Sequence, residues 1–85
     1  MVIASLFPNP AKSVVNMQVA SPADHKVTIV ISDITGRPVY SQMASLETGS
    51  NGITLDVSRL PGGTYNIKVI CTGNHESAVA RFVKQ

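Results

Sequence analysis

The sequence predicts an all-β fold, an antiparallel sandwich of about six to seven strands. Residues with β-branched side chains, which favour strands over helices, are abundant: 11 Val, 7 Ile and 6 Thr. Short apolar alternations also recur along the chain, and turn residues separate them. The alternations start near residues 14, 27, 38, 53, 64 and 77, a spacing typical of sandwiches.

The first two predicted strands are residues 14–19 and 26–32. In both, every odd-numbered position is apolar, so one face of each strand is expected to be buried. A polar turn over residues 33–37 follows, in which Asp33 can bond the nearby backbone and Gly36 can take a positive φ. The residues expected to face inward are Val15, Met17, Val19, Val27, Ile29 and Ile31.

Four further strands are predicted, over residues 38–43, 53–57, 64–71 and 77–83. Pro38 fits the first position of a strand or an edge. Residues 47–52, 58–63 and 72–76 are rich in polar residues and glycine and are expected to be loops. A helix over residues 42–48 stays open as an alternative. Residues 6–10 contain two prolines and fit a stiff linker rather than a strand interior.

Composition and spacing argue against an enzyme, a cofactor or a metal site. The two histidines, His25 and His75, stand far apart in polar turns, without metal-ligand spacing. Cys71 is the only cysteine and alternates in step with apolar residues, which predicts a core position. The 7 Lys and Arg residues are scattered and aromatic residues are few, so no nucleic-acid surface is expected. Neither a leader peptide nor a bilayer-spanning run is visible.

Four motifs occur in a specific order along the chain. They are Phe7-Pro8-Asn9-Pro10, then Asp33-x-x-Gly36-Arg37, then Leu60-Pro61-Gly62-Gly63-Thr64-Tyr65, and lastly Arg81-Phe82-Val83-Lys84-Gln85. Together they resemble the type A C-terminal sorting domain of the type IX (Por) secretion system, from about Leu6 to Gln85. The family often has Tyr where Phe7 stands.

The resemblance implies an immunoglobulin-like sandwich at the end of an exported Bacteroidota protein. Such a domain takes an upstream cargo of the same polypeptide through the periplasm to an outer-membrane translocon. A sortase-like cysteine protease then removes it, and the cargo is attached to the cell surface or secreted. On this basis residues 1–7 are expected to be a linker that retains part of the cleavage region, and residues 8–85 the sorting domain.

Site residues follow from the same resemblance. The translocon or the protease is expected to recognise Arg81, Phe82, Val83, Lys84, Gln85 and Lys68. The cleavage-proximal residues are Ser5, Leu6, Phe7, Pro8, Asn9 and Pro10. A structural role is expected for Asp33, Gly36, Arg37, Gly62, Gly63 and Tyr65. In particular, Tyr65 is expected to turn its ring inward and bond a backbone group through its hydroxyl.

An immunoglobulin-like binding or adhesion module is the alternative function. Such a module needs exposed aromatic side chains or a continuous patch, and the only aromatic residues are Phe7, Tyr40, Tyr65 and Phe82. No small-molecule ligand is expected. Strand edges can also pair with a second copy of the chain, because an unpaired edge is a template for association.

Overall fold

The computed structural model of the chain describes residues 1–73 and 76–85. Within them it has seven strands and no helix. The strands are β1 (Val2–Phe7), β2 (Val14–Ser21), β3 (His25–Asp33), β4 (Pro38–Leu46), β5 (Gly49–Asp56), β6 (Gly63–Cys71) and β7 (Ser77–Lys84). The loop expected over residues 72–76 includes Asn74 and His75, which lie outside the described residues.

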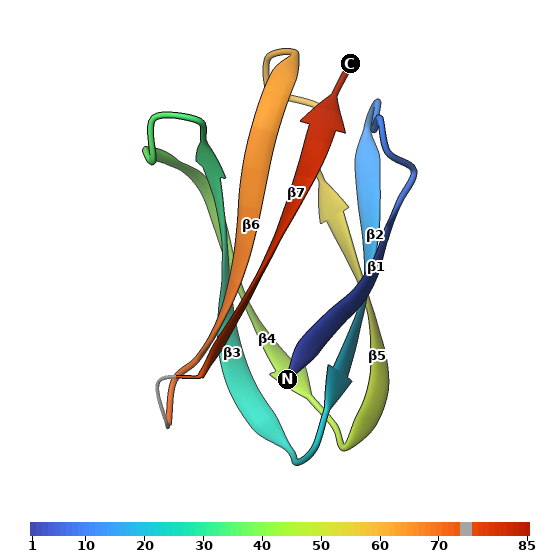
Figure 1. Cartoon of the computed structure of the whole chain (residues 1–85), viewed down its shortest axis with the longest axis vertical. Coiled ribbons are helices and arrows are strands. Elements are labelled where there is room, and N and C mark those ends of the chain that lie inside the picture. Colours follow the sequence, from blue (N-terminus) through green and yellow to red (C-terminus); the bar gives the residue numbers. More distant parts are fainter. Residues whose placement is uncertain (74–75) are drawn as a thin grey trace.

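The strands form two sheets that face each other, as Figure 1 shows. One sheet has the order β1-β2-β5 and the other the order β4-β3-β6-β7. Every neighbouring pair is antiparallel. The predicted antiparallel sandwich is therefore confirmed, and its division into three and four strands is one that immunoglobulin-like domains also use.

The hydrophobic core lies between the sheets and is built from alternate positions of the strands. All six inward residues predicted in β2 and β3 are fully buried, because successive side chains of a strand point to opposite faces. Phe82 is the largest fully buried side chain, and Cys71 is also buried, as predicted. His25, expected in a turn, is instead the first residue of β3.

Residues 2–7 form a strand, although no strand was predicted before residue 14. This strand, β1, pairs with β2, placing Leu6 opposite Met17 and Ile3 opposite Val19. Leu6 and Ile3 pack against the core. The register shifts between Ile3 and Ser5, so the apolar residues of β1 follow no regular alternation. That irregularity explains why the strand was not predicted.

Two boundaries also differ from the prediction. Residues 49–52, expected in a loop, are the first half of β5 and pair with the end of β2. Cross-strand contacts explain this pairing, since the Ser50 hydroxyl donates to Gln18 Oε1 at 3.0 Å. β4 continues to Leu46, so the helix left open for residues 42–48 is wrong over residues 42–46.

Candidate functional site

Three connections and the end of β7 lie at one end of the sandwich, at the top of Figure 1. The strands run alternately up and down, so β1, β3, β5 and β7 all finish there. The connections are residues 8–13, 34–37 and 57–62. Most residues that carry the family resemblance are therefore gathered at this end.

The segment that follows β1 is hydrogen-bonded directly to the end of β7. Ala11 N–H donates to the Val83 carbonyl at 2.7 Å, and Gln85 N–H donates to the Ala11 carbonyl at 2.8 Å. Asn9 Oδ1 accepts a hydrogen bond from Val83 N–H at 3.0 Å. We name Asn9, Ala11, Val83 and Gln85 the clamp. Because the clamp occupies these backbone groups, they are not available for strand addition at the end of β7.

The side chains of β7 alternate between the core and the surface. Phe82 is fully buried, and Arg81 and Val83 on either side are exposed. Lys84, expected to offer a charge to a receptor, instead shares the inward face with Phe82 and is only 9% exposed. Its Nζ donates to the Gln85 carbonyl at 2.9 Å. The strand period of two explains this placement, because residues 82 and 84 necessarily share one face.

Lys68 and Arg81 lie on the outer face of the four-stranded sheet. In the pairing of β6 with β7, Lys68 lies opposite Val79. Arg81 lies opposite Asn66, two residues away along each strand. Both cationic side chains are exposed. In the described part of the chain, neither makes an ion pair or a side-chain hydrogen bond. They are therefore accessible to a partner.

Tyr65 links the connection before β6 to β7. Its hydroxyl donates to the Pro61 carbonyl at 2.6 Å, four residues back. This is the geometry of the tyrosine corner of immunoglobulin-like domains. The buried ring of Tyr65 stacks on Phe82, with centroids 5.5 Å apart. Gly62 lies against the end of the chain, since a Cβ there would be 3.4 Å from the Gln85 carbonyl carbon.

The turn between β3 and β4 is held by one carboxylate. Asp33 Oδ1 accepts from the Thr35 hydroxyl at 2.6 Å, and from the N–H groups of Thr35 and Arg37 at 3.0 and 3.1 Å. Arg37 Nε lies 3.4 Å from Asp33 Oδ2, and Gly36 has φ of 89°. The Thr35 hydroxyl, followed by the N–H donors and the Arg37 charge, lowers the pKa of Asp33 despite some desolvation. Strand β6 lies between this turn and β7, so the turn is not part of the clamp.

A comparison with known protein families shows which family this chain belongs to. The profile of one family, the secretion system C-terminal sorting domain, matches residues 5–85, which include both sheets and the clamp. This chain belongs to that family. It is a C-terminal sorting signal for type IX secretion, and its family is not a family of enzymes. No curated protein and no solved structure matches the chain significantly.

Membership of the family places the sorting domain on an exported protein. That protein passes through the outer-membrane type IX system, and the sorting domain acts together with the secretion machinery and a cargo polypeptide. In the described residues, no helix has the length and apolar character needed to cross a membrane.

The opening element of the sorting domain, residues 8–10, is exposed and contributes Asn9 to the clamp. The Phe7–Pro8 and Asn9–Pro10 peptide bonds are both cis. A groove of about 260 Å³ lies beside this element and is lined by Pro8, Pro10, Lys12, Ser13, Val14 and Gln85. Sequence reasoning missed Ala11, because a single small residue forms no pattern that indicates a contact with β7.

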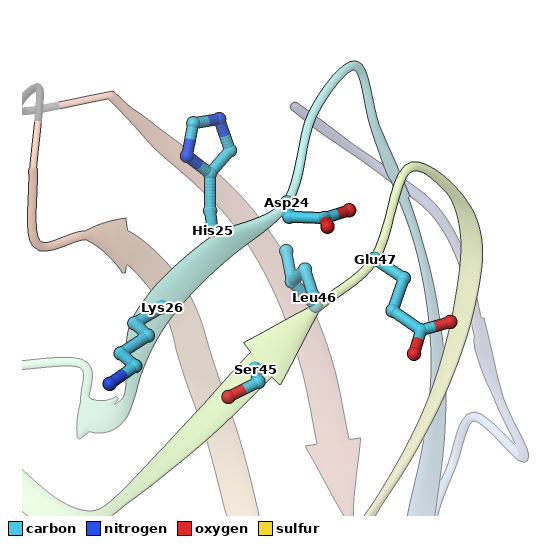
Figure 2. Close-up of a pocket in the computed structure, with 6 residues that line it drawn as sticks. All are labelled: Asp24, His25, Lys26, Ser45, Leu46 and Glu47. Atoms are coloured by element: carbon cyan, nitrogen blue, oxygen red, sulfur yellow. The ribbon is translucent and has the colours of Figure 1, made fainter.

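A second hollow, drawn in Figure 2, lies at the opposite end of the sorting domain, and its polar side chains do not point toward one another. The carboxylates of Asp24 and Glu47 point to one side, whereas the His25 ring and Lys26 point in other directions. Asp24 Oδ1 accepts from the Thr48 N–H at 2.9 Å, so its role is local. No group of three His, Cys, Asp or Glu side chains that could hold a metal occurs in the described residues.

Proposed function

We propose that this sorting domain carries an upstream cargo of the same polypeptide through the outer-membrane translocon of the type IX system. A sortase-like cysteine protease then removes the domain, and the cargo is attached to the cell surface. Family membership supports the sorting role. The clamp is the observation that supports the finer proposal.

The clamp joins the two parts of the domain that the proposal assigns to the secretion machinery. Residues 81–85 are the recognition strand, and residues 5–10 lie next to the cleavage region. Asn9 and Ala11 are hydrogen-bonded to Val83 and Gln85, so the two parts lie side by side on one surface. A receptor that binds β7 would therefore hold the cleavage region close to itself.

Recognition on this proposal goes through side chains rather than through the strand edge. Arg81 and Val83 project from β7, and Lys68 projects from the neighbouring strand on the same face. The clamp already uses the backbone groups at the end of β7. Because the strand is ordered before binding, little conformational entropy is lost when a receptor engages it. Phe82 contributes by anchoring the strand in the core.

Cleavage close to residues 5–7 requires a local opening of the domain. These residues are in β1 and pair with β2, where Phe7 lies opposite Asn16. A protease that binds its substrate as an extended chain cannot surround a segment that is bonded to its neighbour in a sheet. The proposal is therefore that β1 separates from β2 before the peptide bond is cut.

The alternative function, a binding or adhesion module, receives less support. Tyr65 and Phe82 are buried, and Tyr40 is half-buried. Phe7, which is 49% exposed, is the single aromatic side chain well exposed in the described residues. One isolated ring does not make the continuous aromatic surface that such a module needs.

Secretion of a fused passenger tests the sorting role. The passenger carries the domain with residues 83–85 deleted, or with Arg81→Glu, in a host that has a type IX system. Arg59→Glu is the matched control, because Arg59 is an exposed cation that lies outside β7, in the connection between β5 and β6. We expect both β7 variants to lose surface delivery and the control to keep it. Normal delivery by both β7 variants would overturn the proposal.

A disulfide across β1 and β2 tests the opening step. Phe7→Cys with Asn16→Cys places two thiols on directly paired residues. In the same host, we expect the oxidised form to reach the translocon with its domain attached. The same variant under reducing conditions should be processed normally. Equal processing of the oxidised and reduced forms would show that β1 need not separate.

A further inference from the structure

The outer face of the three-stranded sheet is satisfied by its own side chains. The Ser50 hydroxyl donates to Gln18 Oε1 at 3.0 Å, and the Thr54 hydroxyl donates to Asn16 Oδ1 at 2.9 Å. Both bonds join β5 to β2 on the side away from the core, because these residues alternate with the buried ones of β2. The charged residue of this face is an anion, Asp56.

The outer face of the four-stranded sheet differs in its charge. Asp33 is the only acidic residue in its four strands, and it holds the turn before β4. Lys68 and Arg81 point outward, and in the described part of the chain neither has an ion-pair partner. A third outward cation, Lys26, lines the hollow at the far end together with acidic residues. The unneutralised positive charge is therefore concentrated where β6 pairs with β7.

Aliphatic side chains surround these two cations. Lys68 lies in one row between Val30 of β3 and Val79 of β7. Val79 is 62% exposed, and Val83, two residues beyond Arg81, is 40% exposed. We name the combined surface the outer patch, and its residues are Val30, Lys68, Ile70, Val79, Arg81 and Val83.

The outer patch favours an anionic partner. Lys68 and Arg81 occupy diagonal positions on neighbouring strands, which places their Cα atoms about 7–8 Å apart. Two like charges at this separation repel each other, and an anionic group placed between them relieves the repulsion. The aliphatic side chains around them exclude water once they are covered, so each ion pair becomes stronger in the bound state.

The geometry points to a protein of the type IX machinery whose docking surface combines carboxylates with apolar side chains. Its Asp or Glu side chains bind Lys68 and Arg81, and its apolar side chains cover Val30, Val79 and Val83. This inference rests on the proposed sorting function and adds the chemistry of the partner. It also extends the recognised surface from β7 across β6 to β3.

An anionic membrane is the other source of negative charge, and the outer patch fits it less well. Proteins that bind at a membrane surface use Trp and Tyr as interfacial anchors, and polybasic sites typically hold four to eight cations. The chain has no Trp, and Tyr65 is buried in the core. The outer patch supplies two cations on a flat aliphatic surface, which suits a few placed carboxylates.

Substitutions of Lys68 test the charge requirement. The passenger fused to the domain carries Lys68→Glu or Lys68→Arg in a host that has a type IX system. We expect Lys68→Glu to lower surface delivery by at least about tenfold, because it sets like charges against the partner. Lys68→Arg keeps the charge and should be delivered normally. Arg59→Glu is the matched charge control in the connection between β5 and β6. Thermal unfolding of each variant verifies the fold.

Carbodiimide cross-linking tests the chemistry of the partner directly. The reagent joins an amine to a carboxylate in contact with it, as an amide. In outer membranes of the same host, we expect a product in which Lys68 Nζ is joined to an Asp or Glu side chain of another protein. Lys68→Arg should lose this product while its delivery continues, because a guanidinium is not coupled. A host without the translocon should also lack the product.

The outcomes separate this inference from the sorting function. Suppose that deletion of residues 83–85 abolishes delivery. Normal delivery of Lys68→Glu, or the absence of any product between residue 68 and a carboxylate, would then overturn the acidic partner and leave the sorting role intact. Normal delivery of both the deletion variant and Arg81→Glu would overturn the sorting role itself.

Vesicle sedimentation tests the membrane alternative. The purified chain is mixed with phosphatidylglycerol vesicles at physiological salt. We expect the chain to stay in the supernatant, and Lys68→Glu to behave in the same way. Sedimentation of the wild-type chain that Lys68→Glu abolishes would assign the outer patch to lipid and would overturn the proposal.

Discussion

The carboxamide oxygen of Asn9 accepts a hydrogen bond from the backbone N–H of Val83, 74 residues further along the chain, at 3.0 Å. Ala11 adds two backbone hydrogen bonds to the same stretch of β7. The element that opens the sorting domain thus holds its last strand in place. Because β1 and β7 belong to different sheets, this contact also closes one side of the sandwich.

Replacing Asn9 should loosen the end of β7. Asn9→Ala removes the acceptor of the Val83 N–H, and the loss of one such hydrogen bond costs about 1 kcal/mol. We expect a lower free energy of unfolding and faster amide exchange at Val83. Asn16→Ala is the control, because Asn16 Oδ1 accepts from the Thr54 hydroxyl within the sheet that does not contain β7. Unchanged exchange at Val83 in Asn9→Ala would contradict a role for the clamp.

Truncating Phe82 should unfold much of the population. Phe82 is fully buried and stacks on Tyr65. Phe→Ala in a core typically costs about 3–5 kcal/mol, which approaches the ~5 kcal/mol total stability of a domain this small. Circular dichroism during heating measures the loss. Val83→Ala, on the neighbouring residue that is 40% exposed, should unfold close to wild type. A cooperative transition near wild type for Phe82→Ala would be the contrary result.

The hydroxyl of Tyr65 should contribute to stability separately from its ring. Tyr65→Phe keeps the stacking on Phe82 but loses the hydrogen bond to Pro61, at a cost of about 1 kcal/mol. Denaturant unfolding should therefore show a lower midpoint with an unchanged slope. Tyr40→Phe is the control, since its hydroxyl bonds another side chain at a half-buried edge. An equal or larger effect in Tyr40→Phe would contradict a specific stabilising role for the hydrogen bond between Tyr65 and Pro61.

Acid should weaken the fold through two aspartates. The Thr35 hydroxyl lowers the pKa of Asp33, and the Ser58 hydroxyl lowers that of Asp56, both from an ordinary value of 3.8. The unfolded chain therefore binds protons more readily than the folded one. The stabilisation is present above pH 3.8 and is lost as the pH falls through the lower folded pKa values.

The paired amide variants test this pH dependence. Asp33→Asn with Asp56→Asn keeps a side-chain oxygen for each turn but removes both titrations. We expect the Tm of the double variant to fall less steeply with acidification below pH 3.8 than that of the wild type. The single variants should lie between the two. Parallel Tm curves for all four proteins would show that these carboxyl groups do not cause the acid sensitivity.

Local pattern was sufficient to predict much of the sandwich. The alternation in residues 14–19 and 26–32 correctly identified the buried faces, because a strand turns successive side chains to opposite sides. The contacts of Tyr65 with Pro61, and of Asp33 with Arg37, span only four residues each. Both contacts therefore depend on residue types that stand close together in the sequence.

Tertiary structure alone decided the features that join distant parts of the chain. The register against β2 made residues 2–7 a strand and extended β5 back to Gly49. The hydrogen bond of Asn9 to Val83 has no counterpart in any local pattern. The order of the motifs in the sequence was enough to identify the family. The sequence did not show that these motifs assemble into one surface, or that Arg81 faces outward and Lys84 inward. Both depend on strand register and on the packing of the two sheets, which bring together residues that are far apart along the chain.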